Sequence, residues 1–245
     1  MSKKATERSR SQRAAALVAE QRRRESRRRT TIIASVVGVV VVLLAAAVFL
    51  GGRGDTSGEA ATEVPGGVDD YTVSVGDADA PTTITVYEDP QCPICKAFEA
   101  EVADPVAQAV DAGDVRVDYR IVSFLDQASA NEYSSRAANA LMAVQDVAGP
   151  DAFAEMHRIL FENQPAEGSA GPEDAQLVDW AVQAGAEQAE VQPLIEDKVF
   201  EQYVVNATDQ MSKNGVNGTP TVLMDGEPAG ETPQESVDAV LDAVS

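Results

Sequence analysis

The stretch DPQCPICK, residues 89–96, holds both cysteines of this 245-residue chain, at positions 92 and 95. Because the sequence has no third cysteine, we expect Cys92 and Cys95 to pair with each other and the bond between them to be made and broken in function. The apolar residues Ile84–Tyr87 before the stretch read as a strand, and residues 97–112 after it read as a helix. A C-x-x-C motif between a strand and a helix favours a redox motif.

The spacing has a physical consequence for the two thiols. A cysteine at a helix start lies among unpaired backbone N–H groups and at the positive end of the helix dipole. Both stabilise a thiolate, so we expect the pKa of Cys92 to lie below the free value of about 8.5. Cys95 lies one turn further on and is shielded, close enough to attack a mixed disulfide formed at Cys92. Pro93 suits the first helical turn, where its missing N–H costs nothing.

Three other interpretations of the motif compete. A zinc site needs about four ligands, and the chain offers two cysteines and His157, some sixty residues away, so we predict no metal. A c-type haem needs histidine directly after the second cysteine, and Lys96 stands there. A purely structural disulfide stays open, although such a short loop restricts the unfolded chain little.

The N-terminus suggests a membrane anchor. Residues 1–30 carry eleven Lys or Arg and three Glu, and residues 32–50 carry no charge. At about 1.5 Å per residue, the uncharged run nearly spans a hydrocarbon core. A cleaved signal peptide is the alternative, but this run exceeds the usual apolar region of one. We therefore predict a basic cytoplasmic leader over 1–30, a transmembrane helix over 31–50 and an exported remainder.

The remainder differs sharply in composition. The whole chain has a net charge of −21, so residues 31–245 carry about −29, which disfavours nucleic acid as a partner. Residues 51–70 are rich in Gly and Ser and read as a flexible linker. The last 175 or so residues fit one compact domain.

Within residues 71–245 the pattern alternates between strands and helices. Residues 71–75, 82–87, 115–124 and 221–224 read as strands, and a long helical stretch separates the last two. Gly113 closes the helix after the cysteines, and Gly149-Pro150 ends the first helix of the helical stretch. We expect His157, on the next helix, to be a half-exposed structural residue.

Two motifs together resemble the DsbA-like thioredoxin-fold proteins. The first is DPQCPIC at 89–95, followed by a helix that contains Pro105; the second is GVNGTPT at 215–221, which resembles the cis-proline loop of that family. The helical segment at about 127–203 looks like the helical domain that these proteins insert into the thioredoxin fold. The resemblance covers 71–245 and implies an α/β thioredoxin fold with an inserted helical domain, here preceded by a single transmembrane helix.

The resemblance also implies residue roles. Cys92 would attack and form mixed disulfides, Cys95 would resolve them, and a cis Thr219–Pro220 bond would present the backbone of Thr219 to a substrate strand. Many members carry an acid six residues before the first cysteine, where it assists proton transfer, and this chain has Val86 there.

Two acids nearby are placed differently. Glu88 and Asp89 follow the strand directly, and we expect both to be exposed turn residues. Glu88 remains a candidate substitute for the missing acid.

These features predict a membrane-anchored, extracytoplasmic thiol–disulfide oxidoreductase that acts on cysteines of exported proteins, as an oxidase. Its cofactor would be the Cys92–Cys95 disulfide alone, and a quinone-linked membrane enzyme would re-oxidise it. A reductase or isomerase is the alternative within the same chemistry, since Thr before the cis-proline occurs in isomerase-type relatives. A non-catalytic binding or assembly module for exported proteins, with an idle disulfide, is the alternative of another class.

Overall fold

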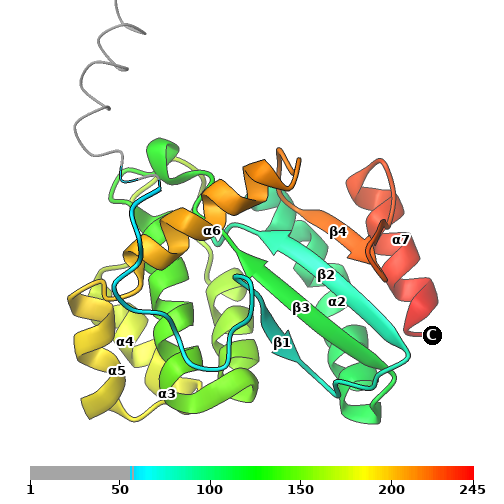
Figure 1. The fold of residues 1–245 in the computed structure, drawn as a ribbon, viewed down its shortest axis with the longest axis horizontal. Helices are drawn as coiled ribbons and strands as arrows, with labels where there is room; N and C mark the ends of the chain where they lie inside the picture. The colour runs from blue at the N-terminus through cyan, green and yellow to red at the C-terminus, as the bar shows by residue number, and fades with distance from the viewer. Residues whose placement is uncertain (1–55, 57) are drawn as a thin grey trace, which may run out of the picture. The chain divides into compact units, whose positions relative to one another are not determined.

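A mixed β-sheet forms the centre of the part of the chain that the computed structural model describes, which is residue 56 and residues 58–245. Its five strands lie in the order β1-β3-β2-β4-β5, and Figure 1 shows them edge to edge. Only β2 and β3 run parallel, and the other neighbours are antiparallel. The strands are β1 Val73–Val75, β2 Thr82–Glu88, β3 Val115–Ile121, β4 Thr221–Met224 and β5 Glu227–Pro228.

Helices cover both faces of this sheet (Figure 1). Because side chains alternate between faces along a strand, Val86 of β2 points to a cluster with Val102 of α2 (Pro93–Ala112) and Val240 of α7 (Pro233–Ala243). The next residue, Tyr87, packs with Met211 of α6 (Glu201–Lys213) on the other face. The sheet is therefore the middle layer of three.

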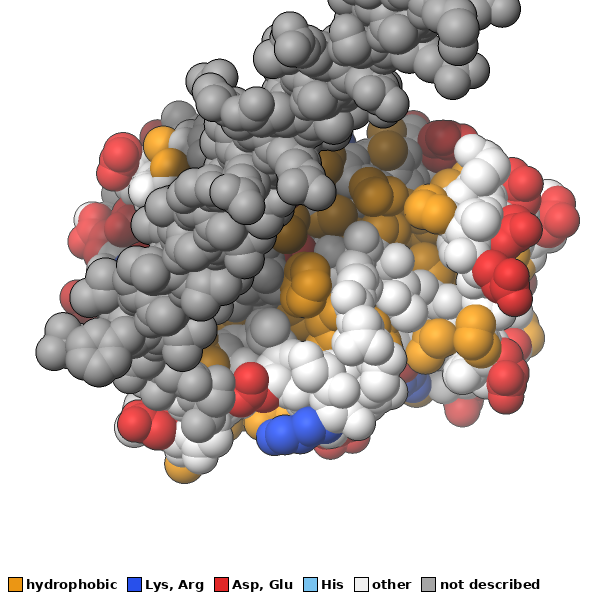
Figure 2. All heavy atoms as spheres, turned by 90° about the horizontal axis from the view of Figure 1, so that it is seen from above, with side chains coloured by type: hydrophobic (Ala, Val, Ile, Leu, Met, Phe, Trp, Pro, Cys, Tyr) orange, Lys and Arg blue, Asp and Glu red, His pale blue; other side chains and the backbone are white. Residues whose placement is uncertain are grey.

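The arrowheads of β2 and β3 in Figure 1 point toward the side of the molecule seen in Figure 2. On that side, apolar side chains gather in a hollow, acidic side chains lie along its edge, and Lys and Arg are sparse. This distribution agrees with the strongly acidic composition of the body. The residues that follow the C-terminal ends of β2 and β3 therefore lie on this side of the molecule.

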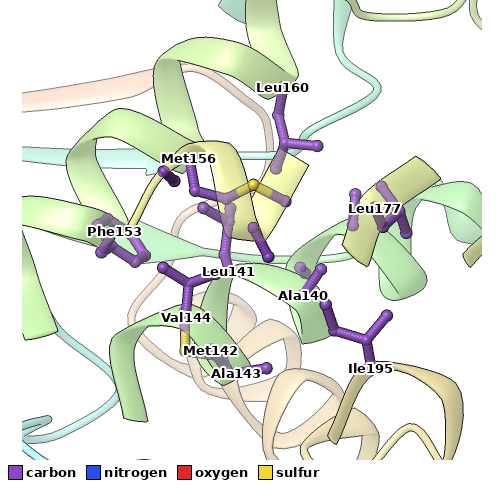
Figure 3. Close-up of a cluster of buried hydrophobic side chains, with 14 of the residues drawn as sticks. Ala140, Leu141, Met142, Ala143, Val144, Phe153, Met156, Leu160, Leu177 and Ile195 are labelled. Carbon is purple, nitrogen blue, oxygen red and sulfur yellow. The ribbon is translucent and has the colours of Figure 1, made fainter. Parts of the chain in front are cut away.

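A helical region is inserted between β3 and β4, as the resemblance predicts. It contains η1 Asp126–Ala128, α3 Tyr133–Glu162, α4 Asp174–Gln183, α5 Gln188–Glu196 and α6. Its core is built around α3, and Figure 3 shows Leu141, Met156 and Leu177 pointing toward one another from α3 and α4. The helix α3 bends at Gly149, whose backbone is not helical (φ 82°, ψ −172°). The predicted break at Gly149-Pro150 thus divides α3 into two halves.

The helix after the cysteines is longer than the expected span of 97–112, because it already begins at Pro93. It ends at Gly113, which has the left-handed backbone (φ 79°) that glycine adopts without strain. The following strand ends at Ile121 rather than at Phe124, because the chain turns there toward the inserted helices.

The end of the predicted linker contacts the inserted helices. The side-chain amide of Gln145 donates to the carbonyl of Gly66 (3.1 Å), and that of Gln202 donates to the carbonyl of Thr56 (3.0 Å). No helix within the described residues is long and apolar enough to cross a membrane. The transmembrane helix predicted over 31–50 lies outside those residues.

Candidate active site

Cys92 lies at the point where the chain passes from β2 into α2. It is the N-cap residue, with extended backbone (φ −72°, ψ 117°), and Pro93 occupies the first turn. The backbone N–H of Cys95 points at the Cys92 sulfur, at 3.5 Å. The predicted thiol at a helix start is therefore present, and the unpaired N–H groups of that helix end are directed at it.

The two cysteines are free thiols with different surroundings. Cys92 retains 4% of its surface and Cys95 none, and the two form a buried cluster with Phe161, against which Leu125 packs. The hydrogen bond from the Cys95 thiol, with further ones from Thr219 and the backbone, lowers the pKa of Cys92 to about 6. Burial raises the pKa of Cys95 far above its ordinary value. Cys92 is thus the thiolate at neutral pH.

One of the two predicted substrate-binding residues, Thr219, lies against Cys92. The Thr219–Pro220 peptide bond is cis, as the resemblance implies. The carbonyl oxygen of Thr219 lies 3.3 Å from the Cys92 sulfur. The fold thus brings together residues 127 positions apart in the sequence, because β4 follows Pro220 and pairs with β2.

The loop that carries the cysteines is tied to the inserted helices. The side-chain amide of Gln164 donates to the carbonyl oxygens of Pro90 (3.0 Å) and Cys92 (2.9 Å). Asp89 accepts the backbone N–H groups of Gln91 (2.8 Å) and Leu125 (2.7 Å). Asp89 is fully buried, so the expectation of an exposed turn residue is wrong for it. Its carboxylate replaces water as the acceptor for these two donors.

Two acids and a histidine form a buried cluster whose charges act on the cysteines. Glu88 is fully buried rather than exposed, and His157 is 2% exposed rather than half-exposed, so both expectations are wrong. Both are buried because they contact each other: His157 Nε2 lies 2.8 Å from Glu88 Oε2, and His157 Nδ1 lies 3.9 Å from Glu99 Oε2. Each residue supplies the polar partner that the others need to be buried.

Burial sets the protonation of this cluster. It raises the pKa of Glu88 well above its usual range, raises that of Glu99 to about 8, and lowers that of His157. At neutral pH Glu99 is therefore largely protonated and His157 is neutral. The nearby Cys92 charge also raises the pKa of Glu88, and the charge of Glu88 in turn raises that of Cys95.

The sequence contained one signal for this cluster. Glu99 lies four residues after Cys95, and Val102 and Val106 continue the same buried face of α2, so helical periodicity points Glu99 inward. Nothing local marks His157, which reaches Glu88 across 69 positions.

Within the described residues, Glu88, Glu99 and His157 are also a group whose ligand atoms, all within 4.8 Å of one another, lie close enough to hold a metal ion. The three positions come from β2, α2 and α3. That the protein functions without a metal remains a prediction.

A thiolate cysteine at the start of a helix, facing a cis-proline loop beside a mixed sheet, defines a thioredoxin-fold redox protein. The family model described as thioredoxin matches residues 69–243. The chain belongs to this family and, within it, to the DsbA-like thiol–disulfide oxidoreductases.

Solved structures of that class are similar to this chain. The oxidised DsbA of Mycobacterium tuberculosis is 32% identical, with a TM-score of 0.60 over 71% of this chain and 93% of that one. The reduced disulfide bond oxidoreductase DsbG of the same organism has the same identity and TM-score, over 71% and 88%. BdbD of Bacillus subtilis is 24% identical, with a TM-score of 0.59 over 71% and 92%, which shows the shared fold.

Curated relatives match over a shorter region. The serine/threonine-protein kinase PknE of M. tuberculosis is 31% identical over 157 residues, which are 61% of this chain and 28% of that protein. The disulfide bond formation protein D of B. subtilis is 27% identical over 154 residues, which are 61% of this chain and 66% of that protein. This chain therefore spans little more than a quarter of the kinase's length.

Proposed function

We propose that this protein is an extracytoplasmic thiol–disulfide oxidase that transfers its Cys92–Cys95 disulfide to cysteines of exported proteins. The observation that carries the proposal is the difference between the two thiols. The pKa of Cys92 is lowered to about 6, whereas that of Cys95 is raised by burial. A stabilised thiolate favours the reduced form, and a favoured reduced form makes the disulfide a stronger oxidant.

The reaction follows from this geometry. A substrate thiolate attacks the Cys92 sulfur, the Cys92–Cys95 bond breaks, and Cys95 leaves and takes up a proton. A second thiolate of the substrate then attacks the substrate sulfur of the mixed disulfide. The substrate disulfide forms, and Cys92 departs as a thiolate. Thr219 and Pro220 would hold the substrate strand beside Cys92, because the Thr219 backbone lies against that sulfur.

The remaining parts of the proposal rest on the sequence. The basic leader and uncharged run support a single-pass protein of the cell membrane, with its N-terminus cytoplasmic and residues 71–245 outside. The Cys92–Cys95 disulfide would serve in place of any metal or organic cofactor. Re-oxidation would need a membrane partner, and a quinone-linked enzyme has the chemistry to accept the two electrons.

Refolding of a reduced, disulfide-containing ribonuclease tests the proposal. We expect the oxidised protein to form disulfides stoichiometrically, and Cys92→Ser to abolish this while binding of unfolded substrate persists. A Cys92→Ser variant as active as the wild type would instead support a binding module. Catalysed reduction of insulin without net oxidation of the ribonuclease would support the reductase alternative.

A further inference from the structure

A cavity of about 370 Å³ lies between α2 and the second half of α3, against the face of the sheet that carries Ile84. Most of its wall is apolar, formed by side chains such as Phe98 and Val106 of α2. Neither the cysteines nor the cis-proline loop lines it, so it is separate from the place where disulfides are exchanged. Its volume lies within the range found for sites that bind small molecules.

The side chains at the opening of this cavity are acidic. Asp104 and Asp111 of α2 and Asp151 of α3 line the cavity and are also exposed, so they mark where it reaches the surface. Arg158 is the one Lys or Arg among the described residues that line it, and it already forms an ion pair with Glu155 (2.6 Å). The resulting negative potential attracts cations and repels anions such as fatty acids.

One carboxyl group of the cavity wall is buried. Glu99 is 9% exposed and lines the cavity. Its Oε2 lies 3.9 Å from His157 Nδ1, which is longer than a hydrogen bond, and its hydrogen bond with Glu88 joins two acids. No Lys or Arg within the described residues forms an ion pair with Glu99. A buried carboxylate needs such a partner to offset its lost hydration, and a cation in the cavity would supply it.

Two aromatic rings of the wall suit the same kind of ligand. Phe98 and Tyr119 both line the cavity, and the face of an aromatic ring attracts an ammonium group. Tyr119 lies beside the His157 imidazole, with ring centroids 4.7 Å apart. The cavity thus combines apolar side chains, aromatic rings and carboxyl groups, which together favour an organic cation.

We propose that this cavity binds an alkylammonium ion, whose ammonium group pairs with Glu99 and whose alkyl chain lies along the apolar wall beside Phe98 and Val106. The inference goes beyond the proposed function, because it concerns binding at a place that takes no part in disulfide exchange. Burial of the alkyl chain favours binding, and the ammonium group brings three N–H donors to the carboxylate. A carboxylic acid of the same length would bring its charge against Glu99, so the site selects by charge.

The experiment titrates the oxidised protein with n-octylammonium chloride at pH 9 and measures the heat of binding. Octan-1-ol and sodium octanoate are the matched ligands, since they carry the same chain with a neutral and an anionic head. We expect octylammonium to bind at one site, octan-1-ol to bind about 10-fold more weakly, and octanoate to show no measurable affinity. Equal affinities for the three ligands, or no binding of octylammonium, would overturn the proposal.

Removal of one charge tests where the ammonium group lies. Glu99→Gln keeps the size of the side chain, so it should weaken octylammonium binding by about 10-fold and leave octan-1-ol binding unchanged. A merely structural role of Glu99 would instead weaken the binding of both ligands alike. Glu101→Gln is the matched control, because Glu101 is exposed on the same helix, and it should change neither affinity. An unchanged octylammonium affinity in Glu99→Gln would overturn the pairing.

The apolar wall has its own test. Ala154 lines the cavity, so Ala154→Leu fills part of it and should abolish the binding of both octylammonium and octan-1-ol. Ala100→Leu is the matched control, because Ala100 is exposed on α2 and does not line the cavity. Ala103→Leu, at another position of the wall, serves if Ala154→Leu does not fold. An unchanged octylammonium affinity in the filled variant would overturn the assignment to this cavity.

The pH dependence of binding gives a third test. The other titratable groups that face Glu99 or line the cavity are Glu88 of β2, Tyr119 of β3, Asp104 and Asp111 of α2, and Asp151, Glu155, His157 and Arg158 of α3. Burial raises the pKa of Glu99 to about 8, so octylammonium affinity should rise between pH 7 and pH 9 as this carboxyl loses its proton. The amine stays charged over that range, because its pKa is close to that of lysine. A rise of the same size in Glu99→Gln would contradict the role of Glu99.

Discussion

The pKa of Cys92 determines how the reduction potential of the cysteine pair should depend on pH. Below the pKa, reduction takes up two protons with two electrons, and above it only one, since Cys95 stays protonated. For a two-electron couple the potential should fall by about 59 mV per pH unit below pH 6 and by about 30 mV per unit above it. The pH at which this slope changes, called the break below, is expected at the Cys92 pKa, about 6.

The same pKa gives the size of the effect at neutral pH. Relative to a thiol with the ordinary value of 9.0, ionisation at pH 7 stabilises the reduced protein by about 1.4 kcal/mol. That free energy corresponds to a potential about 30 mV more oxidising. The sign follows from linkage: the pKa is lowered in the reduced protein, so the stabilisation is present above pH 6 and is lost as the pH falls through that value.

The assay equilibrates the protein with glutathione redox mixtures across this pH range, quenches with acid and counts free thiols by mass after alkylation. Thr219→Val removes a hydroxyl that stabilises the thiolate, and a hydrogen bond to a charged group is worth about 1.5 kcal/mol. The break should therefore rise by about one pH unit. Thr221→Val is the matched control, because its hydroxyl bonds to Gly218 instead. A wild-type break near 9, or one that Thr219→Val leaves in place, would refute the reasoning.

Three further outcomes are expected. Iodoacetamide at pH 6 should label Cys92 of the reduced protein far faster than Cys95, and equal rates would contradict the assigned pKa difference. In the oxidised protein, the free energy of unfolding should fall as pH rises toward 8, because the raised pKa of Glu99 makes the native state bind a proton that the unfolded state releases. Urea titrations of Glu99→Gln should show a weaker dependence of the unfolding free energy on pH. An unchanged dependence in that variant would assign it to other groups. Gln164→Leu should lower the unfolding free energy by about 1–3 kcal/mol through two lost hydrogen bonds to the cysteine loop, and an unchanged urea midpoint would show that the tie is dispensable.

Local signals explain which features of the fold could be predicted from sequence. The cysteines, Pro93 and Gly113 each act through the backbone of their own turn, so their positions mark the start and end of α2. The capping box at the start of α7 has the same local origin, since the reciprocal bonds of Thr232 and Glu235 join residues three apart.

The wrong predictions of exposure concern residues that are buried by contacts between distant elements. In the sequence, Glu88 comes directly after the apolar run Ile84–Tyr87 and before a proline-containing turn, which by itself is typical of an exposed acid. It is buried because His157, from a helix far along the chain, packs against it. No pattern within one element shows that contact, since it depends on how the second half of α3 is oriented after the bend at Gly149. The same holds for Gln164, whose two acceptors belong to the cysteine loop.

The inserted helical region therefore completes the redox site as well as covering it. Phe161 belongs to the buried cluster of the two cysteines, His157 contacts Glu88, and the side-chain amide of Gln164 donates to two carbonyl oxygens of the cysteine loop. His157 and Phe161 lie near the end of α3, spaced so that they share one face of the helix, and Gln164 follows just after the helix ends. The polar cluster of Glu88, Glu99 and His157 is built from three separate elements, β2, α2 and α3. A change that tilts the end of α3 should thus alter the pKa of Cys95 and the loop geometry together, even though it touches neither cysteine.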